Sequence, residues 1–361
     1  MQDIASARWT EERAWAWYRG HPWLVGFNYV PSTAINTTEM WQRDTFDPAT
    51  IDRELGWGAR IGFNSCRVFL QYLVWSDDPA GAVDRIDRFL DIADRHNIST
   101  ILCPFDDCAF SGRQPSLGSQ AAPRIGIHNS GWTPSPGHGR VTDRAAWPDL
   151  RAFIAAIVSR FGRDRRVLLW DLYNEPGNAG MGEASLPLLQ ETFHWARDTN
   201  PEQPLTAGLW SRDLPNLNAA MRGASDVITF HDYFDLSSVE QNIAALRAVG
   251  RPIVCTEWMR RNHGSLFSTH LPVFAREGVG CYFWSLVNGR TQTHLPWGSP
   301  EGAGEPPVWY HDLLRPDGTF HLEEERATIA ASTAARPQRD NGGGLTQELI
   351  AYYIQLAEGR R

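Results

Sequence analysis

The chain has 361 residues, of which 42% are hydrophobic, so it can bury the core of one large domain or of two smaller ones. Its net charge of −8, with no run of basic residues before the last two positions, argues against nucleic acid or an anionic membrane surface as a partner. No stretch reaches the ~18 consecutive apolar residues of a membrane span.

Short apolar stretches alternate with amphipathic stretches along most of the chain. The apolar stretches are typical of buried parallel strands and cover residues 23–29, 63–70, 99–105, 167–176, 205–210, 226–231, 251–257 and 280–286. The amphipathic stretches have helical spacing and cover residues 8–18, 48–57, 83–96, 147–161, 186–198, 239–249 and 266–276. This alternation predicts a single (β/α)8 TIM barrel, whose lower end the first helix is expected to cover.

Two segments depart from the alternation. Residues 110–140 are rich in Gly, Pro, Ser and His, and a loop of this length is usually functional. Because this loop follows the third predicted strand, we expect it to cover the active face. We assign residues 1–335 to the barrel, 336–344 to a flexible joint and 345–361 to a C-terminal amphipathic helix. This helix is expected to pack on the barrel or, alternatively, on a second subunit in a homo-oligomer.

The types of residue that are absent narrow the possible chemistry. The chain has no Lys, which excludes Schiff-base aldolases, pyridoxal enzymes and P-loop NTPases. It also has no CxxC or HExxH motif, so we expect no metal and no cofactor. The odd number of cysteines and the N-terminus, which lacks the pattern of a signal peptide, predict a cytoplasmic protein.

The fourth predicted strand ends in residues that can do chemistry. Pro176 cannot donate to a sheet, so Asn174 and Glu175 should lie at the C-terminal tip of this strand. Catalytic residues collect at that end of a barrel. Taken alone, however, the stretch Asn-Glu-Pro fits a plain turn equally well.

The other predicted strands carry polar or aromatic residues at the same end. These residues are Arg67, Asp106, Asp107, His231, Tyr233, Glu257 and Trp284. Each also fits a structural role, such as a buried ion pair for Arg67 or a hydrogen-bonded core position for His231. Two glutamates without a metal or Lys nevertheless favour general acid/base and nucleophilic catalysis, and retaining glycosidases use such a pair about 5 Å apart.

The ordered set of motifs resembles the clan A glycoside hydrolases, most closely glycoside hydrolase family 5. The matching residues are Asn174-Glu175-Pro176, His231-Asp232-Tyr233, Glu257, Trp284 and the second-strand Arg67. Each motif is weak by itself, but together they extend over residues 20–290 in the order that is typical of the family.

The resemblance implies a role for each matching residue. Glu175 would be the general acid/base, with a pKa raised by burial and by its anionic partner. Glu257 would be the nucleophile, and Asn174 would bind the sugar 2-hydroxyl. The remaining roles follow from the same resemblance: Arg67 and Tyr233 would keep the nucleophile ionised, Trp284 would lie under the −1 sugar, and His231 would orient Glu175 or a sugar hydroxyl.

One departure from the family pattern affects the expected specificity. Family 5 enzymes usually have a His near the end of the third strand, whereas this chain has Asp106 and Asp107 there. One of these carboxylates is expected to bind sugar hydroxyls, or else to cap the next turn.

We therefore predict a retaining β-glycosidase that acts on short β-linked oligosaccharides and releases single sugars. A β-mannosidase is the first expectation, followed by a β-glucosidase or a furanosidase. The alternatives are an endo-β-glycanase of the mannanase or cellulase type and a non-catalytic sugar-binding barrel.

Overall fold

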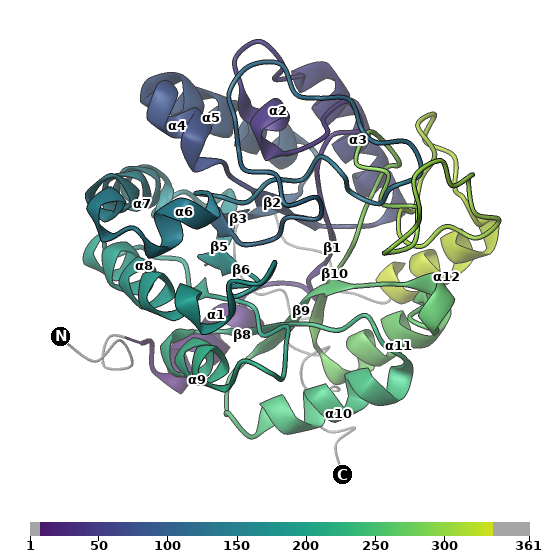
Figure 1. The fold of residues 1–361 in the computed structure, drawn as a ribbon. Helices are drawn as coiled ribbons and strands as arrows, with labels where there is room; N and C mark the ends of the chain where they lie inside the picture. The colour runs from purple at the N-terminus through teal and green to yellow at the C-terminus, as the bar shows by residue number, and fades with distance from the viewer. Residues whose placement is uncertain (1–7, 335–361) are drawn as a thin grey trace.

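The computed structural model describes residues 8–334, and its centre is a sheet of eight parallel strands (Figure 1). The strands are β1 (Val25–Asn28), β2 (Ser65–Phe69), β3 (Ser99–Cys103), β5 (Val167–Asp171), β7 (Leu205–Thr206), β8 (Ile228–His231), β9 (Ile253–Trp258) and β10 (Gly280–Phe283). All lie within the predicted stretches except the end of β9, which extends one residue beyond its prediction.

The sheet curves into an almost closed barrel. Its strand order is β7-β5-β3-β2-β1-β10-β9-β8, and a parallel bridge between Leu209 and Phe230 joins the two outer strands. Two short strands, β4 (Phe105–Asp106) and β6 (Tyr173–Asn174), pair beyond the tips of β3 and β5. The prediction of a (β/α)8 barrel is confirmed.

Helices surround the sheet on its outer side (Figure 1). The predicted ones are α1 (Glu11–Arg19), α3 (Pro48–Ile61), α5 (Pro79–Arg95), α7 (Trp147–Phe161), α8 (Leu186–Asp198), α10 (Leu236–Arg247) and α11 (Phe267–Glu277). The structure adds helices that the sequence pattern did not indicate: α2 (Thr37–Trp41), α4 (Tyr72–Asp77), α6 (His138–Thr142), α9 (Pro215–Ala224) and α12 (Glu323–Ala334). Most of these are too short for a periodic pattern. Helix α12 begins with three consecutive glutamates and has few buried residues, so its sequence shows no clear apolar pattern.

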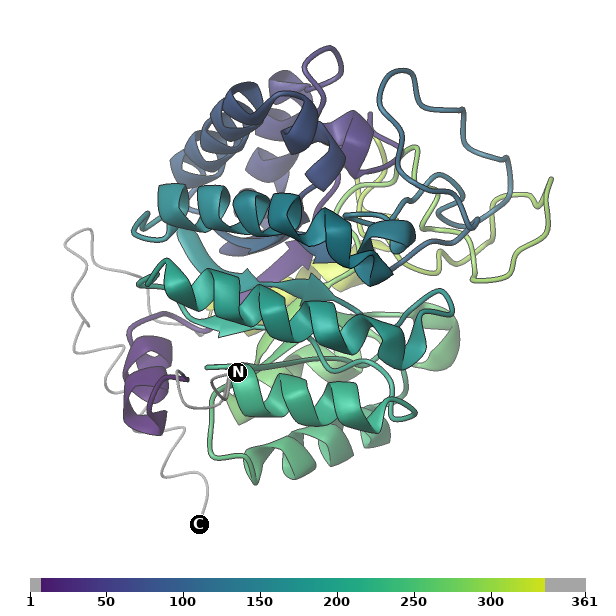
Figure 2. The same cartoon turned by 60° about the vertical axis from the view of Figure 1, so that its left-hand side comes forward.

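Helix α1 covers the lower, N-terminal end of the barrel, as expected (Figure 2). The hydroxyl of Tyr18 donates to the carbonyl of Gly278 at 2.8 Å and accepts from the backbone N–H of Gly280 at 2.8 Å. The Tyr18 ring belongs to a buried cluster with Leu24, Tyr282 and other residues of the barrel interior. The opposite end of the barrel is therefore the one available for a functional site.

The long segment after β3 lies at the opposite end of the molecule from α1 (Figure 2). Residues 110–140 run beside residues 290–302 and are irregular up to helix α6. This arrangement confirms a long loop after the third strand. The predicted joint at 336–344 and the predicted helix at 345–361 lie outside the described residues. Among the described helices, none has the length and apolar character that crossing a bilayer requires.

Candidate active site

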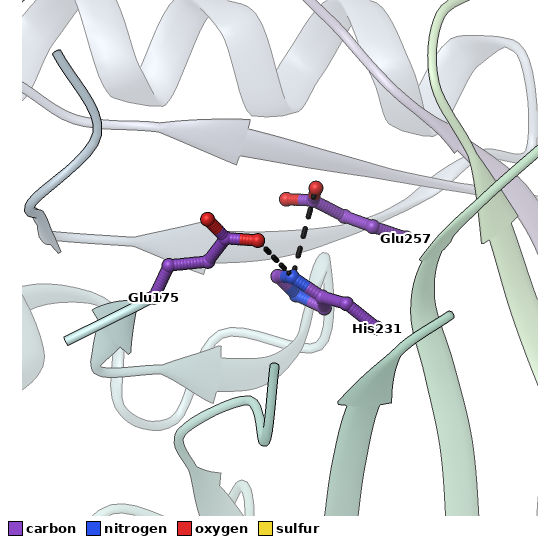
Figure 3. A group of neighbouring side chains, drawn as sticks. All are labelled: Glu175, His231 and Glu257. Atoms are coloured by element: carbon purple, nitrogen blue, oxygen red, sulfur yellow. Dashed lines mark hydrogen bonds and ion pairs between the residues drawn. The ribbon is translucent and has the colours of Figure 1, made fainter. Parts of the chain in front are cut away.

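Glu175 and Glu257 face one another at the C-terminal end of the barrel, with His231 beside them (Figure 3). Glu175 follows β6, and its backbone has a φ of +40°, a left-handed conformation that is strained for a residue with a side chain. His231 Nδ1 lies 2.7 Å from Glu175 Oε1 and 3.6 Å from Glu257 Oε2. Ligand atoms of the three side chains all lie within 4.8 Å of one another, a spacing that suits a retaining pair of carboxylates.

Arg67 lies at the centre of a buried polar network beneath Glu257. Its Nη1 donates to Glu257 Oε1 at 2.8 Å and to Asn28 Oδ1 at 2.9 Å. Its Nε donates to Asp171 Oδ2 at 2.8 Å, and its Nη2 donates to Asn174 Oδ1 at 2.7 Å. Burial alone would lower the pKa of Arg67, but the negative charges of Asp171 and Glu257 raise it. Arg67 is therefore a fixed cation that positions a carboxylate and an amide together.

The second oxygen of Glu257 also accepts a hydrogen bond. The hydroxyl of Tyr233 donates to Glu257 Oε2 at 2.7 Å. Burial and the negative charge of Glu257 raise the pKa of Tyr233, so its hydroxyl remains protonated and continues to donate. Both oxygens of Glu257 are therefore held by donors, which fix the orientation of this carboxylate.

Glu175 is held by a different set of side chains. Its Oε2 accepts from Cys108 Sγ at 3.2 Å and from Asn178 Nδ2 in a short contact, while its Oε1 contacts His231. Burial raises the pKa of Glu175, but the hydrogen bond and charge of His231 outweigh it and lower the pKa below its ordinary value. Burial lowers the pKa of His231, but the charge of Glu257 and the contact with Glu175 raise it.

These pKa directions correct the expectation that Glu175 itself has a raised pKa. The sequence indicates burial and an anionic partner, but it does not reveal that a histidine contacts Glu175 directly. In the free enzyme the proton therefore lies mainly on His231, within one 2.7 Å hydrogen bond of Glu175.

Asp107 is enclosed by protein and closes the turn that follows β6. Its Oδ1 accepts from the Tyr173 hydroxyl at 2.7 Å. Its Oδ2 accepts from the backbone N–H of Gly177 at 2.7 Å and from the Ser185 hydroxyl at 2.5 Å. These contacts use both oxygens, so the alternative prediction, a structural role in a turn, fits this position better than a sugar contact.

Asp106 is also buried and connects two other side chains of the site. Its Oδ1 accepts from Asn174 Nδ2 at 2.8 Å and from the backbone N–H of Cys108 at 2.9 Å. Its Oδ2 accepts from Trp132 Nε1 at 2.7 Å. Burial raises the pKa of Asp106 to about 7, although each of these donors lowers it. Neither Asp106 nor Asp107 is among the residues that line the cavity, and a direct contact of either with substrate stays a prediction.

A cavity of about 350 Å³ lies above the two glutamates. The predicted residues that line it are Asn174, Glu175, His231, Tyr233, Glu257 and Trp284. Loops and strand tips add residues that the sequence patterns did not single out, among them Cys108, Phe110, His128, Asn129, Trp132, Asn178, Trp210, Trp297 and His311. The cavity is thus an aromatic chamber with a pair of carboxylates at its floor, a composition suited to sugar rings.

Comparison with known families agrees with this geometry. A family model described as "Cellulase (glycosyl hydrolase family 5)" matches residues 33–290, which is more than half of the chain. The chain belongs to glycoside hydrolase family 5. This family 5 protein is therefore a glycoside hydrolase that cleaves O-glycosidic bonds of oligosaccharides with retention of configuration.

Solved structures share the fold at low sequence identity. A single-residue variant of GH5_18 from Streptomyces cattleya, in complex with Manβ1-4GlcNAc, is 15% identical, with a TM-score of 0.56, 86% of this chain and 79% of that chain covered. The exo-β-1,4-mannosidase from Opitutaceae bacterium strain TAV5 is 17% identical, with a TM-score of 0.57, and the match covers 86% of this chain and 59% of that chain. The endo-β-1,4-mannanase from Thermotoga petrophila is 13% identical, with a TM-score of 0.55, and the match covers 88% of this chain and 78% of that chain. No curated protein sequence matches the chain.

Glu175, His231 and Glu257 could by their spacing also hold a metal ion. However, both oxygens of Glu257 already accept hydrogen bonds, and the Arg67 cation lies 2.8 Å from one of them. A cation bound here would be repelled by Arg67 and would displace the Tyr233 hydroxyl. In this family 5 site, the three side chains therefore fit proton transfer and nucleophilic attack better than metal binding.

Proposed function

We propose that the protein is an exo-acting β-mannosidase that removes single sugars from short β-linked oligosaccharides. In this proposal Glu257 is the nucleophile and attacks the anomeric carbon, while Arg67 and Tyr233 hold its carboxylate in place. The glycosyl–enzyme ester that forms is then hydrolysed by water. The hydrogen bonds from Arg67 and Tyr233 support this assignment because they hold the Glu257 carboxylate in a fixed orientation.

Glu175 protonates the leaving oxygen in the first step and removes a proton from water in the second. The acid form of Glu175 is made when His231 passes its Nδ1 proton across their hydrogen bond. The leaving oxygen then takes the proton from Glu175. When water attacks, Glu175 accepts its proton and passes it back to His231 Nδ1, which restores the starting state. The raised pKa of His231 supports this role because it favours a proton on the ring that contacts Glu175.

Asn174 and Trp284 recognise the sugar that is cleaved. Asn174 is fixed from both sides, because its Oδ1 accepts from Arg67 and its Nδ2 donates to Asp106. An amide held in this way can contact a sugar hydroxyl without losing side-chain entropy on binding. Trp284 lines the same cavity, and its ring supplies an apolar surface for the sugar.

The single observation that carries the exo assignment is the wall formed by residues 110–140. The backbone N–H of Asn129 donates to Thr291 O at 2.8 Å, and that of Gly302 donates to Ile125 O at 2.7 Å. The side chain of Ser299 donates to Gly126 O at 2.7 Å. These bonds fasten the loop to residues 290–302.

Trp132 extends this wall into the cavity. Its ring packs edge-on against Phe69 and Trp284, with ring centroids 5.3 Å and 5.8 Å apart. Its Nε1 is fixed by Asp106. A wall that is fixed by both packing and a hydrogen bond obstructs a long chain that extends past the sugar on Trp284.

The mannoside preference rests on two of the similar structures. One is in complex with Manβ1-4GlcNAc, and another is an exo-β-1,4-mannosidase. The endo-β-1,4-mannanase has a comparable TM-score, so an endo mode of attack remains the second candidate.

The product pattern on a mannotetraose or mannopentaose distinguishes these modes. We expect mannose and a chain shortened by one unit as the first products. Early release of disaccharides and trisaccharides would replace the exo assignment with the endo one. Parallel assays with aryl β-mannoside, β-glucoside and β-galactoside test the sugar, and a preference for a sugar other than mannose would contradict the mannoside assignment.

A further inference from the structure

Two histidines that the proposed mechanism does not use line the cavity side by side. His128 belongs to the long loop and His311 to the segment after β10, and their ring centroids are 5.5 Å apart. Both side chains are almost fully buried, with exposures of 4% and 1%. Their rings lie near Tyr233 and Trp297, which also line the cavity.

The hydrogen bonds of the two rings fix which nitrogen carries the proton. His128 Nδ1 lies 2.7 Å from the carbonyl oxygen of Leu295, and His311 Nδ1 lies 2.6 Å from that of Met259. A carbonyl oxygen only accepts, so both Nδ1 atoms carry a hydrogen and donate it. Each neutral ring therefore has its lone pair on Nε2.

The charge state of the rings is consistent with this tautomer. Burial lowers the pKa of His128 to about 4. Burial and the neighbouring His128 lower the pKa of His311 well below its ordinary value. Both rings are therefore neutral at the pH where the enzyme is expected to work.

The Nε2 atoms have no partner among the described residues. Neither Nε2 forms a hydrogen bond within residues 8–334. Neither is among the polar atoms of that part of the chain that are fully enclosed without a partner, so both remain accessible. On each ring, Nε2 is directed away from the backbone carbonyl that holds Nδ1. The cavity thus has two adjacent hydrogen-bond acceptors on one wall.

We propose that His128 and His311 form a specificity-determining subsite that accepts hydrogen bonds from two free hydroxyl groups of the bound glycoside. The proposal rests on the proposed function, because it assumes that the cavity holds a sugar. The ligand class that fits is a neutral glycoside with unsubstituted hydroxyls toward this wall. A substituent that can only accept, such as a methyl ether or a carboxylate, would place its lone pairs against those of the histidines.

The arrangement predicts effects of different size for two substitutions at each position. In His128→Asn and His311→Asn the side-chain amide nitrogen can still donate to the backbone carbonyl, but the acceptor at Nε2 is lost. In His128→Gln and His311→Gln the longer side chain places an amide oxygen near the former Nε2. We expect the Asn variants to lose roughly tenfold in kcat/KM and the Gln variants to retain more activity.

A series of monodeoxy aryl β-mannosides then tests the contact itself. With the wild-type enzyme, removal of the contacted hydroxyl should lower kcat/KM by roughly tenfold. In the matching Asn variant, the same deoxy substrate and its parent should differ by less than about twofold, because the contact is already lost. His263→Asn changes an exposed histidine outside the cavity lining and serves as the control.

Additive losses for every deoxy position in both Asn variants would overturn the proposal. Thermal unfolding of each variant distinguishes a lost contact from a lost fold. If the wild-type enzyme hydrolyses no β-mannoside, the proposed function fails separately. The subsite is then tested by calorimetry, with mannose and its monodeoxy forms binding to the wild type and to the same variants. Equal affinities of the wild type for all of these sugars would contradict the subsite.

Discussion

The two ends of the barrel interior are built from the same strands but from opposite kinds of side chain. On β2 the inward-facing pair is Ser65 followed by Arg67, and on β5 it is Leu169 followed by Asp171. The lower members of these pairs lie beside an apolar cluster under α1, whereas the upper members form the charged network below Glu257. On each of these strands, the layer that packs the lower end and the layer that carries the charged network are thus only two residues apart.

The close packing of the lower layer is clearest at β1. A Cβ atom on Gly26 would lie 2.2 Å from the carbonyl oxygen of Ser65 and 2.7 Å from the Tyr282 ring. Only glycine fits there, while Asn28, two residues later, reaches Arg67. The comparison suggests that the lower layer supplies the stability that a buried charged network alone does not provide.

The largest effect should come from the upper layer, at the proposed nucleophile. Glu257→Ala should lower kcat by roughly 10⁴-fold or more, because no other carboxylate can form the covalent ester. The thermal unfolding temperature should stay close to that of the wild type, which checks that the fold is intact. Retention of more than a small fraction of the activity would show that the nucleophile is assigned wrongly.

Glu175→Ala should have a large effect that depends on the leaving group. Substrates with good leaving groups need little protonation, so their first step should survive and the glycosyl–enzyme should accumulate. Added azide should restore turnover, because it attacks that ester without needing a base. A variant that is equally inactive on all leaving groups and insensitive to azide would remove Glu175 from the acid/base role.

Cys108→Ala should have an intermediate effect. It removes the thiol that donates to Glu175 Oε2 at 3.2 Å, a contact that lowers the pKa of Glu175. We expect a loss of roughly tenfold or less in kcat and a shift of the basic limb of the pH profile to higher pH, with Cys108→Ser close to the wild type. Cys103→Ala, at the neighbouring strand tip, is the matched control. An unchanged pH profile in Cys108→Ala would argue against the coupling.

Tyr18→Ala should leave kcat almost unchanged but destabilise the lower end. The side chain is 3% exposed and its hydroxyl bridges Gly278 and Gly280, so we expect a loss of roughly 3–5 kcal/mol in the free energy of unfolding. Urea denaturation measures this loss. Tyr18→Phe removes only the hydroxyl and should cost less. A large fall in kcat in a fully folded Tyr18→Ala protein would contradict the view that the lower layer supports stability and the upper layer supports catalysis.

Treatment with EDTA should have no effect on turnover. Arg67 and Tyr233 already engage the carboxylate that a metal would need. Activity is measured before and after dialysis against the chelator. A loss that a divalent ion restores would contradict the acid/base assignment of the upper layer.

The sequence predicted the elements whose signal is local. Strands such as β5 are continuous apolar runs, and the boundaries of α7 and α8 match the predicted ranges because their apolar residues recur at helical spacing. The family motifs were also readable, since they lie at strand ends in a fixed order. By contrast, α9 was missed because one of its buried residues is Asn218, and because the Asn and Gly residues within the helix weaken its apolar pattern.

The partners of each site residue could not be predicted, because they are distant in sequence. Nothing near Asp171 indicates that it will meet Arg67, and nothing near Cys108 indicates that its Sγ will contact Glu175. The partners of Asp106 and Asp107 were hidden from the sequence for the same reason: the donors that enclose both carboxylates come from several separate segments.

The sequence by itself thus determined the barrel, the end at which the chemistry lies and the two glutamates, because hydrophobic periodicity and strand termination are local properties. Only the tertiary structure decided how the glutamates differ. Arg67 and Tyr233 donate to Glu257, whereas His231 and Cys108 contact Glu175. A pKa depends on the charges and donors within a few ångströms in space, and the barrel brings these together from distant strands.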